Sequence, residues 1–401
     1  MSLPTLPIGE RIRHHRLRQG RTQAVVAGLC GITEDYLSQV ERGRKTPSSE
    51  VLARLAVQFG VTAGALLGDP VEDLPVAPAT PGADVVRALL GQQPSAGPAP
   101  TNAVALRERV ENLWRIWQTS PTRFTDAELL LPDLITDVET AVRASRHTTE
   151  SGERRALLRI SADLYGLLRS YCRRAGRLDL ALMVADRALR ASEDADDPLR
   201  IAAAQWNLGH VLLSQPGEEH AAHDTALRAA DALQRELQGP EADAVQGALE
   251  LVAVVAEART HRAWAARDRL ANRVAPLAKQ AGEGNTMWTV FGPVNTELHA
   301  VSVEMLDGNA VEGLRLADKV DTDQLPSRER RMTFGLEVAR CYALRREDAA
   351  VLVHLLELEV LAPEDLQRSP LARELVISLV QRSRPTYRKQ ATALAERLSL
   401  L

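Results

Sequence analysis

Residues 21–67 read RTQAVVAGLCGITEDYLSQVERGRKTPSSEVLARLAVQFGVTAGALL. Thr22 predicts an N-cap for a short helix over Gln23–Cys30, because its hydroxyl can accept a hydrogen bond from a free backbone N–H. Gly31 supplies the left-handed turn that ends this helix. Thr33 then caps a second helix, from Glu34 to about Arg42. The stretch therefore predicts two short helices joined by a tight turn.

The second of these helices has one apolar and one polar face. Leu37 and Val40 point to the core at helical spacing. The opposite face carries polar side chains, namely Glu34, Asp35, Ser38, Gln39 and Arg42. An exposed, polar, capped helix has the dimensions and chemistry to enter the major groove of double-stranded DNA.

The surrounding region extends this interpretation to a domain of residues 1–68. Residues 8–68 predict five short helices, with glycines at or near their ends: Gly20, Gly31, Gly43, Gly60 and Gly68. The whole chain has a net charge of -4, but residues 1–68 carry +4 and the remainder carries -8. A basic head on an acidic body indicates that only the head meets a polyanion.

These residues resemble the phage-repressor-like (Xre/Cro) helix-turn-helix family. The resemblance implies an operator-binding domain that acts as a homodimer on an inverted repeat in double-stranded DNA. It implies that Arg16 and Glu41 form an internal ion pair. It places DNA contacts on Gln23, Thr33, Glu34, Asp35, Gln39, Arg44, Lys45 and Thr46. The polar face of the second helix adds Ser38 and Arg42 to the expected contacts.

The chemistry of these positions leaves two points open. Gln39 can bond adenine, and a carboxylate can accept from cytosine. Glu34 and Asp35 repel phosphates, so they either specify bases or only stabilise the helix end. The alternative for the whole head is a protein-docking module that has lost DNA binding.

The rest of the chain predicts a linker followed by a helical solenoid, so we expect an all-α protein. Residues 69–102 are rich in Pro, Gly and Ala and predict a linker, with a helical turn or two around Ala83–Leu90. Helix pairs then recur over residues 103–401, and such a period is typical of stacked hairpins. The expected pairs are 103–145, 153–194, 198–237, 241–281, 286–320, 329–361 and 365–399.

The hairpins resemble tetratricopeptide repeats, although no unit carries the complete pattern. The residues that carry the resemblance are Tyr165, Leu168, Gly176, Ala181, Ala188, Leu208, Gly209, Ala221, Ala339, Tyr342 and Pro363. Head and repeats together resemble large actinobacterial Xre regulators and, more loosely, peptide-controlled regulators with repeat domains. The resemblance implies a body that senses an effector or dimerises.

No enzyme, cofactor or metal signature is found. The GEGN run at 282–285 lacks the Lys of a phosphate-binding loop. Cys30, Cys172 and Cys341 are scattered, which excludes a zinc site or a disulfide framework and favours a reducing cytosol. The pairs His14–His15 and His220–His223 are expected to be solvated. With neither a signal segment nor a stretch of about 18 apolar residues, we expect a cytoplasmic, nucleoid-associated protein without a membrane partner.

Polar residues within the predicted helices mark a candidate effector site for a peptide or small molecule. Phe291, Asn295 and His299 share one helix face, and Asn207 and His210 share another. An Asn amide can bond an extended peptide backbone, or it can bond a neighbouring hairpin.

The five tryptophans either pack between repeats or form a ligand cage; they are Trp114, Trp117, Trp206, Trp264 and Trp288. Two functions follow. The body is a sensor, or it is a scaffold that only dimerises and docks a partner protein.

Overall fold

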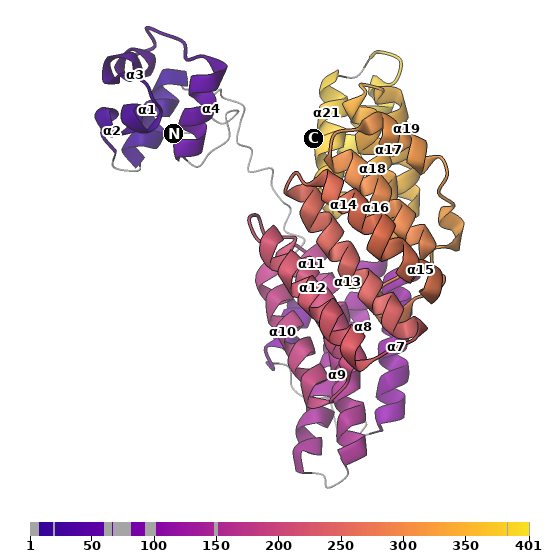
Figure 1. The fold of residues 1–401 in the computed structure, drawn as a ribbon. Helices are drawn as coiled ribbons and strands as arrows, with labels where there is room; N and C mark the ends of the chain where they lie inside the picture. Colours follow the sequence, from indigo (N-terminus) through magenta and orange to yellow (C-terminus); the bar gives the residue numbers. More distant parts are fainter. Residues whose placement is uncertain are drawn as a thin grey trace. The chain divides into compact units, whose positions relative to one another are not determined.

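The computed structural model describes residues 8–18, 21–59, 66, 82–92, 102–147, 151–382 and 384–400. Two compact units divide the chain, residues 1–78 and residues 79–401, and each is described by itself (Figure 1). All regular elements within these described ranges are helices, which confirms the all-α prediction.

The first unit contains four described helices around a small apolar core. They are α1 (Ile8–Arg18), α2 (Gln23–Leu29), α3 (Glu34–Glu41) and α4 (Ser49–Phe59). The hydroxyl of Thr22 accepts from the Val25 N–H at 3.3 Å, and that of Thr33 accepts from the Tyr36 N–H at 3.2 Å. Gly31 has a φ of 62°. Both predicted caps and the left-handed turn are therefore present.

The fifth helix expected in the first unit lies outside the described residues, except for Leu66. That side chain is buried in the same cluster as Ile12, Leu37 and Leu55. The cluster fixes the relative orientation of α2 and α3, because residues of both helices share it.

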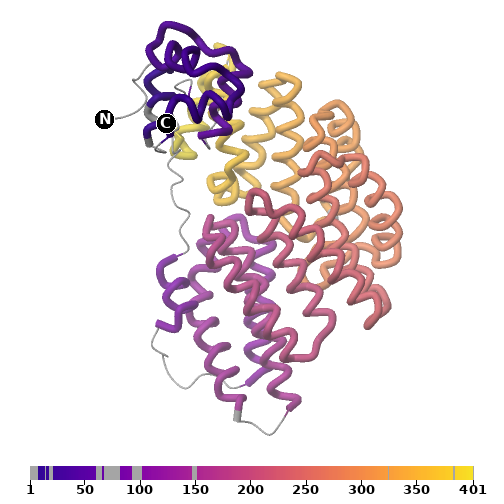
Figure 2. The backbone as a smooth tube through the Cα atoms, turned by 60° about the vertical axis from the view of Figure 1, so that its left-hand side comes forward, coloured from indigo at the N-terminus to yellow at the C-terminus, as the bar shows by residue number. Residues whose placement is uncertain are grey.

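The second unit is a stack of helical hairpins that follow one another in chain order (Figure 2). None of the helices described is long and apolar enough to cross a bilayer. The elements are α6 (Ala83–Leu89), α7 (Ala103–Thr119), α8 (Arg123–Ala144), η2 (Ser145–His147), α9 (Ser151–Arg174), α10 (Leu178–Asp194), α11 (Pro198–Leu212), α12 (Glu219–Glu236), α13 (Pro240–Arg259), α14 (Ala263–Arg269), η3 (Leu270–Val274), α15 (Ala275–Ala281), η4 (Thr286–Trp288), α16 (Pro293–Leu306), α17 (Ala310–Ala317), η5 (Thr322–Gln324), α18 (Arg328–Leu344), α19 (Asp348–Leu361), α20 (Pro363–Arg368), α21 (Pro370–Arg382) and α22 (Arg388–Arg397).

Part of the expected linker belongs to this second unit. Helix α6 buries Val85, Ala88 and Leu89 in the core that α7, α8 and α9 share. The backbone N–H of Gly82 donates to the Tyr171 hydroxyl at 2.9 Å. Residues 82–92 are thus an additional helix of the body, because their apolar face is covered by the first hairpins.

The stack is closed by contacts between its first hairpin and its last ones. The buried guanidinium of Arg123, at the start of α8, donates to Glu329 at 2.8 Å and also to Asp365. The Phe124 N–H donates to the Glu364 carboxylate at 2.7 Å. These partners come from α18 and α20. The contacts therefore hold the first hairpin against the last ones and fix the curvature of the stack.

We expect Arg123→Met to destabilise the body strongly. The substitution leaves the carboxylates of Glu329 and Asp365 without this cation, and breaking a buried ion pair by removing one partner costs about 3–5 kcal/mol. Urea unfolding measures the change. Arg109→Met is the control: its ion pair with Asp137 is partly exposed and is worth about 0–1 kcal/mol. Equal losses in both variants would contradict the closure role.

The docking of α6 makes a second prediction about two adjacent leucines. Leu89 is buried, whereas Leu90 is half exposed. Leu89→Ala is expected to lower the unfolding free energy by about 2–5 kcal/mol through the cavity that it leaves. Leu90→Ala is expected to change it by about 0.5 kcal/mol or less. Urea denaturation of the full chain compares the two, and similar values would mean that α6 does not pack on the body.

Candidate DNA-binding surface and internal cavity

Helix α3 presents the polar face that the sequence predicts. Leu37 and Val40 are fully buried. The ten residues predicted to contact DNA are exposed or half-buried: Gln23, Thr33, Glu34, Asp35, Ser38, Gln39, Arg42, Arg44, Lys45 and Thr46. Their side chains are therefore accessible on one capped helix, at the start of the helix before it and in the turn that follows it.

The first turn of α3 is acidic and organises the glutamine one turn later. The Gln39 amide donates to the Asp35 carboxylate at 2.6 Å. This contact uses one of the two amide hydrogens, and the carbonyl oxygen and the second hydrogen remain for another partner. Asp35 thus holds the Gln39 side chain in a single orientation on the exposed face.

A buried ion pair supports the start of α2. Arg16 donates to both oxygens of the Glu41 carboxylate, at 2.6 and 2.8 Å. Gln23 donates to the same carboxylate at 2.6 Å. The ion pair that the family resemblance implies is present, and it positions Gln23 beside the N-terminus of its helix.

The turn after α3 carries the cations. The backbone N–H groups of Arg44 and Lys45 donate to the Gln39 carbonyl at 2.8 and 3.3 Å. The Lys45 ammonium lies 5.4 Å from the centre of the Tyr36 ring. The backbone is therefore fixed, while the charged ends of these side chains face solvent.

Sequence reasoning missed further residues of this surface. A concave region of about 630 Å³ is lined by residues from α1, α2 and α3, and these include Arg13, Arg21, Thr22, Gln23 and Arg42. Arg13 and Arg21 add positive charge to it. The basic run RIRHHRLRQGR at 11–21 was the signal that could have found them.

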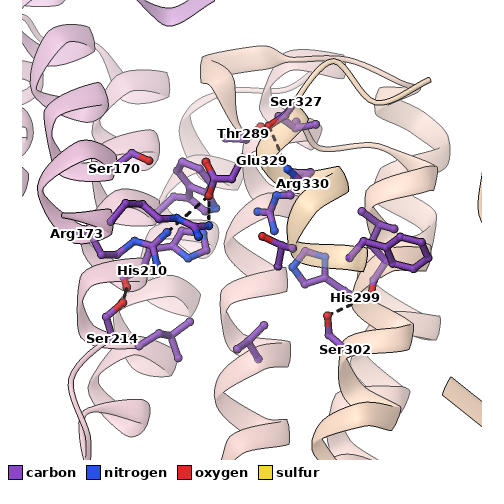
Figure 3. Close-up of a pocket in the computed structure, with 18 of the residues that line it drawn as sticks. Ser170, Arg173, His210, Ser214, Thr289, His299, Ser302, Ser327, Glu329 and Arg330 are labelled. Carbon is purple, nitrogen blue, oxygen red and sulfur yellow. Dashed lines mark hydrogen bonds and ion pairs between the residues drawn. The ribbon is translucent and has the colours of Figure 1, made fainter. Parts of the chain in front are cut away.

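A second candidate site is a cavity inside the helical body (Figure 3). It has a volume of about 220 Å³ and is lined by residues of α7, α9, α11, α13, α16 and α18. Arg173 and His210 border it from one side, and His299 and Arg330 from the other (Figure 3).

Both histidines in this cavity are held neutral. Burial and the neighbouring arginines Arg169 and Arg173 lower the pKa of His210 well below its usual range. Burial, followed by the charge of Arg330, lowers the pKa of His299 to about 3. The His299 Nδ1–H donates to the Asn295 carbonyl at 2.8 Å, so Nε2 is the acceptor nitrogen of this ring.

The other three residues of the predicted effector site do not line this cavity. Asn207 is buried and accepts from Arg169, and it borders a smaller space of about 20 Å³. Asn295 is buried, and its Oδ1 has no hydrogen-bond partner within the described ranges. Phe291 fills the space beside Gly247, where even a Cβ atom would overlap its ring. These three side chains take part in packing between helices.

Four of the five tryptophans border the cavity. Trp114, Trp117, Trp206 and Trp288 belong to its wall, while Trp264 is 73% exposed. Trp114 and Trp288 stack with ring centres 4.7 Å apart. These four rings therefore pack between helices and also border the cavity.

The loop that carries Trp288 has unusual backbone geometry. Met287, Trp288 and Val290 all have a positive φ, at 49°, 57° and 54°, a region that is strained for a β-branched residue. The Asn285 amide donates to Gln118 at 2.7 Å, which ties the loop to α7.

Metal binding and thiol chemistry find little basis in the part of the chain that the structure describes. Its His, Cys, Asp and Glu residues form no group of three or more that could hold a metal ion. Cys30, Cys172 and Cys341 are buried and unpaired. Burial raises the pKa of Cys172 to about 12, which disfavours a reactive thiolate.

The exposed helix α3 and its supports belong to a segment with known relatives. Residues 7–67 match the model of a family described as a helix-turn-helix domain. The transcriptional regulator ClgR of Mycobacterium tuberculosis is 37% identical over 65 residues, which are 16% of this chain and 58% of that protein. The HTH-type transcriptional regulator DdrOP3 of Deinococcus deserti is 43% identical over 58 residues, 14% of this chain and 45% of that protein.

The chain thus spans about half the length of the curated relatives that it matches. Among solved structures, Bacillus thuringiensis PlcR in complex with the peptide PapR7 and DNA aligns with a TM-score of 0.27 and 10% identity. That alignment covers 88% of this chain and 98% of the other. The two curated relatives are named as regulators of transcription and not as enzymes. Residues 7–67 of this chain are a helix-turn-helix domain of the kind present in such regulators.

Proposed function

We propose that the chain is a transcriptional regulator that binds operator DNA in a sequence-specific manner as a homodimer, and whose helical body senses an effector. The observation that carries the DNA-binding part is helix α3, which is capped, exposed and polar on the face opposite Leu37 and Val40. A helix of this kind, packed on a second helix through a buried apolar core, is the element that contacts base edges in the major groove.

Base readout is assigned to the middle of α3. Gln39 offers an amide oxygen and one amide hydrogen after its bond to Asp35, which matches the N6 and N7 edge of adenine. Glu34 and Asp35 are the candidates for accepting from cytosine N4. Ser38 and Arg42 lie on the same accessible face.

Phosphate contacts are assigned to the ends of the motif. Arg44, Lys45 and Thr46 are exposed in the turn after α3, and Arg13 and Arg21 lie on the concave region beside α2. Cations at both sides of a reading helix fix its register on the duplex, while the base contacts specify the sequence.

The sensing role is assigned to the internal cavity. It lies between α9 and α11 on one side and α16 and α18 on the other, and the closure at Arg123 joins the same two parts of the stack. A molecule bound there contacts both parts. It can change DNA binding only through different affinities for two conformations of the body, with a coupling of about 1–3 kcal/mol.

The first prediction of this function separates base readout from phosphate contact. Gln39→Ala is expected to weaken the best site by about 1–3 kcal/mol and to relax selection at one base position. Arg44→Ala is expected to weaken all duplexes alike and to flatten the salt dependence by about one unit. Binding selection from a random duplex library, followed by titrations at several salt concentrations, measures both effects. An unchanged preferred sequence in Gln39→Ala would show that Gln39 does not read a base.

The second prediction concerns the dimer. One head contacts only a short half-site, so specific binding requires two heads on half-sites about 34–36 Å apart, one helical turn of DNA. We expect the selected sites to be inverted repeats and the complex to contain two chains, as measured by mass photometry on the selected duplex. Inserting five base pairs between the half-sites is the control, and it is expected to abolish tight binding because it places the second half-site on the opposite face. Tight binding of a single chain to one half-site would exclude the dimer model.

A further inference from the structure

The internal cavity holds more positive than negative charge. Five arginines line it, Arg169, Arg173, Arg174, Arg259 and Arg330, against two glutamates, Glu329 and Glu337. Glu329 is already shared, because Arg123 and Arg174 both donate to it. The negative charge of Glu329 is therefore already paired with Arg123 and Arg174, at the contacts that close the stack.

Four of the five arginines have no carboxylate close enough for a hydrogen bond, and one of them, Arg259, donates instead to the Leu213 carbonyl oxygen. Arg169 donates to the neutral amide oxygen of Asn207. Arg173 lies 3.9 Å from Glu329, which is an ion-pair distance but not a hydrogen bond. The Arg330 guanidinium has no hydrogen bond or ion pair with any residue that the structure describes. These three side chains meet at the cavity from α9 and α18.

The second glutamate compensates this charge only in part. The Ser302 hydroxyl donates to Glu337 at 2.6 Å, but burial raises the pKa of this carboxyl to about 7. Burial, with the charges of Arg174 and Arg330, lowers the pKa of Arg169 to about 9. Arg169 is buried, and Arg173 and Arg330 are partly buried. Cations removed from water without anionic partners are costly to the fold, so the cavity favours a negative charge that the chain does not supply.

We propose that this cavity binds an oxyanion, the carboxylate or phosphoryl group of a metabolite-sized effector, between the guanidinium groups of Arg169, Arg173 and Arg330. Arginine forks match the geometry of both groups, and such charge-assisted hydrogen bonds are about twice as strong as neutral ones. This inference rests on the proposed sensing function and names the chemistry of its ligand.

The remaining wall sets the size and character of the molecule. A volume of about 220 Å³ is below the range of roughly 300–1,000 Å³ that is typical of drug-sized ligands. The rings of Trp114, Trp206 and Trp288 border the same space. A small molecule with one anionic group and a flat or apolar remainder fits both properties.

The test uses the full-length protein, with inorganic phosphate and citrate as the phosphoryl and carboxylate probes. Melting temperature is measured at constant ionic strength, with chloride as the reference anion. One probe or both are expected to raise it saturably, by about 3–6 °C at a hundredfold excess over Kd. The probe that acts at the lower concentration identifies the source of the oxyanion. No saturable rise with either probe overturns the proposal.

Arg330→Gln gives a result that a structural arginine would not give. Because the Arg330 guanidinium is partly buried and has no hydrogen-bond or ion-pair partner among the described residues, its removal is expected to raise the melting temperature of the protein in chloride. The same variant is expected to weaken oxyanion binding by about 10- to 100-fold in calorimetric titration. Arg173→Gln is the second variant, with the same expected loss of binding. Retention of full oxyanion affinity in both variants overturns the proposal.

Arg340→Gln is the matched control, since Arg340 lies on the same helix and pairs with Glu374 away from the cavity. It is expected to keep the oxyanion response. Binding of the selected duplex without and with the oxyanion is measured on the same samples. If the unmodified protein binds no duplex, the proposed function is contradicted, but the oxyanion titration still tests the cavity on its own. A saturable oxyanion response without a change in DNA affinity supports the site and contradicts its role as a sensor.

Discussion

The positive charge of Arg123 lies in the interior of the helical body, and the chain must bring carboxylates to it. Those carboxylates, Glu329 and Asp365, come from residues 206 and 242 positions further along. A stack of hairpins can place them there only by curving back towards its own beginning. The guanidinium also lies 4.2 Å from the centre of the Trp117 ring, so the same group orients an aromatic side chain of the cavity wall. The curvature, the closure and the wall of the cavity all depend on this one buried cation.

The closure explains why so many arginines share one space. Once α18 lies against α7 and its Glu329 accepts from Arg174 of α9, Arg330 on α18 is near Arg169 and Arg173, which also belong to α9. Burial and these like charges lower the pKa of Arg173 well below its usual range. For Glu329 the neighbouring charges outweigh burial. Burial disfavours the charged carboxylate, but Arg174, Arg123 and Arg173 together hold its pKa well below the usual range. Charge is thus concentrated by the topology rather than by a local run of the sequence.

This difference decides what the sequence could predict. The helix caps at Thr22 and Thr33, the turn at Gly31 and the hairpin pattern depend on neighbours a few residues away, and all are visible in the sequence. The docking of α6 is not, because burial of Leu89 requires helices that follow much later. For the same reason the sequence alone cannot place Asn207 and Asn295 between helices, or bring Arg169 and Arg173 to the same cavity wall as Arg330. The four-residue spacing of Arg169 and Arg173, which places them on one face of α9, was the available signal, but nothing local places Arg330 opposite them.

Under the proposed function, the acidic first turn of α3 has a consequence for the search for a target site on DNA. Glu34 and Asp35 face solvent beside the cations of the motif, and Asp35 also holds Gln39. Attraction to phosphates is the same for every sequence, so in the proposed DNA complex two carboxylates on this face would weaken contacts with random DNA and leave the proposed base contacts in place. Each encounter with a wrong site is then shorter. A protein built in this way gives up some total affinity and spends less of its search time on non-target DNA.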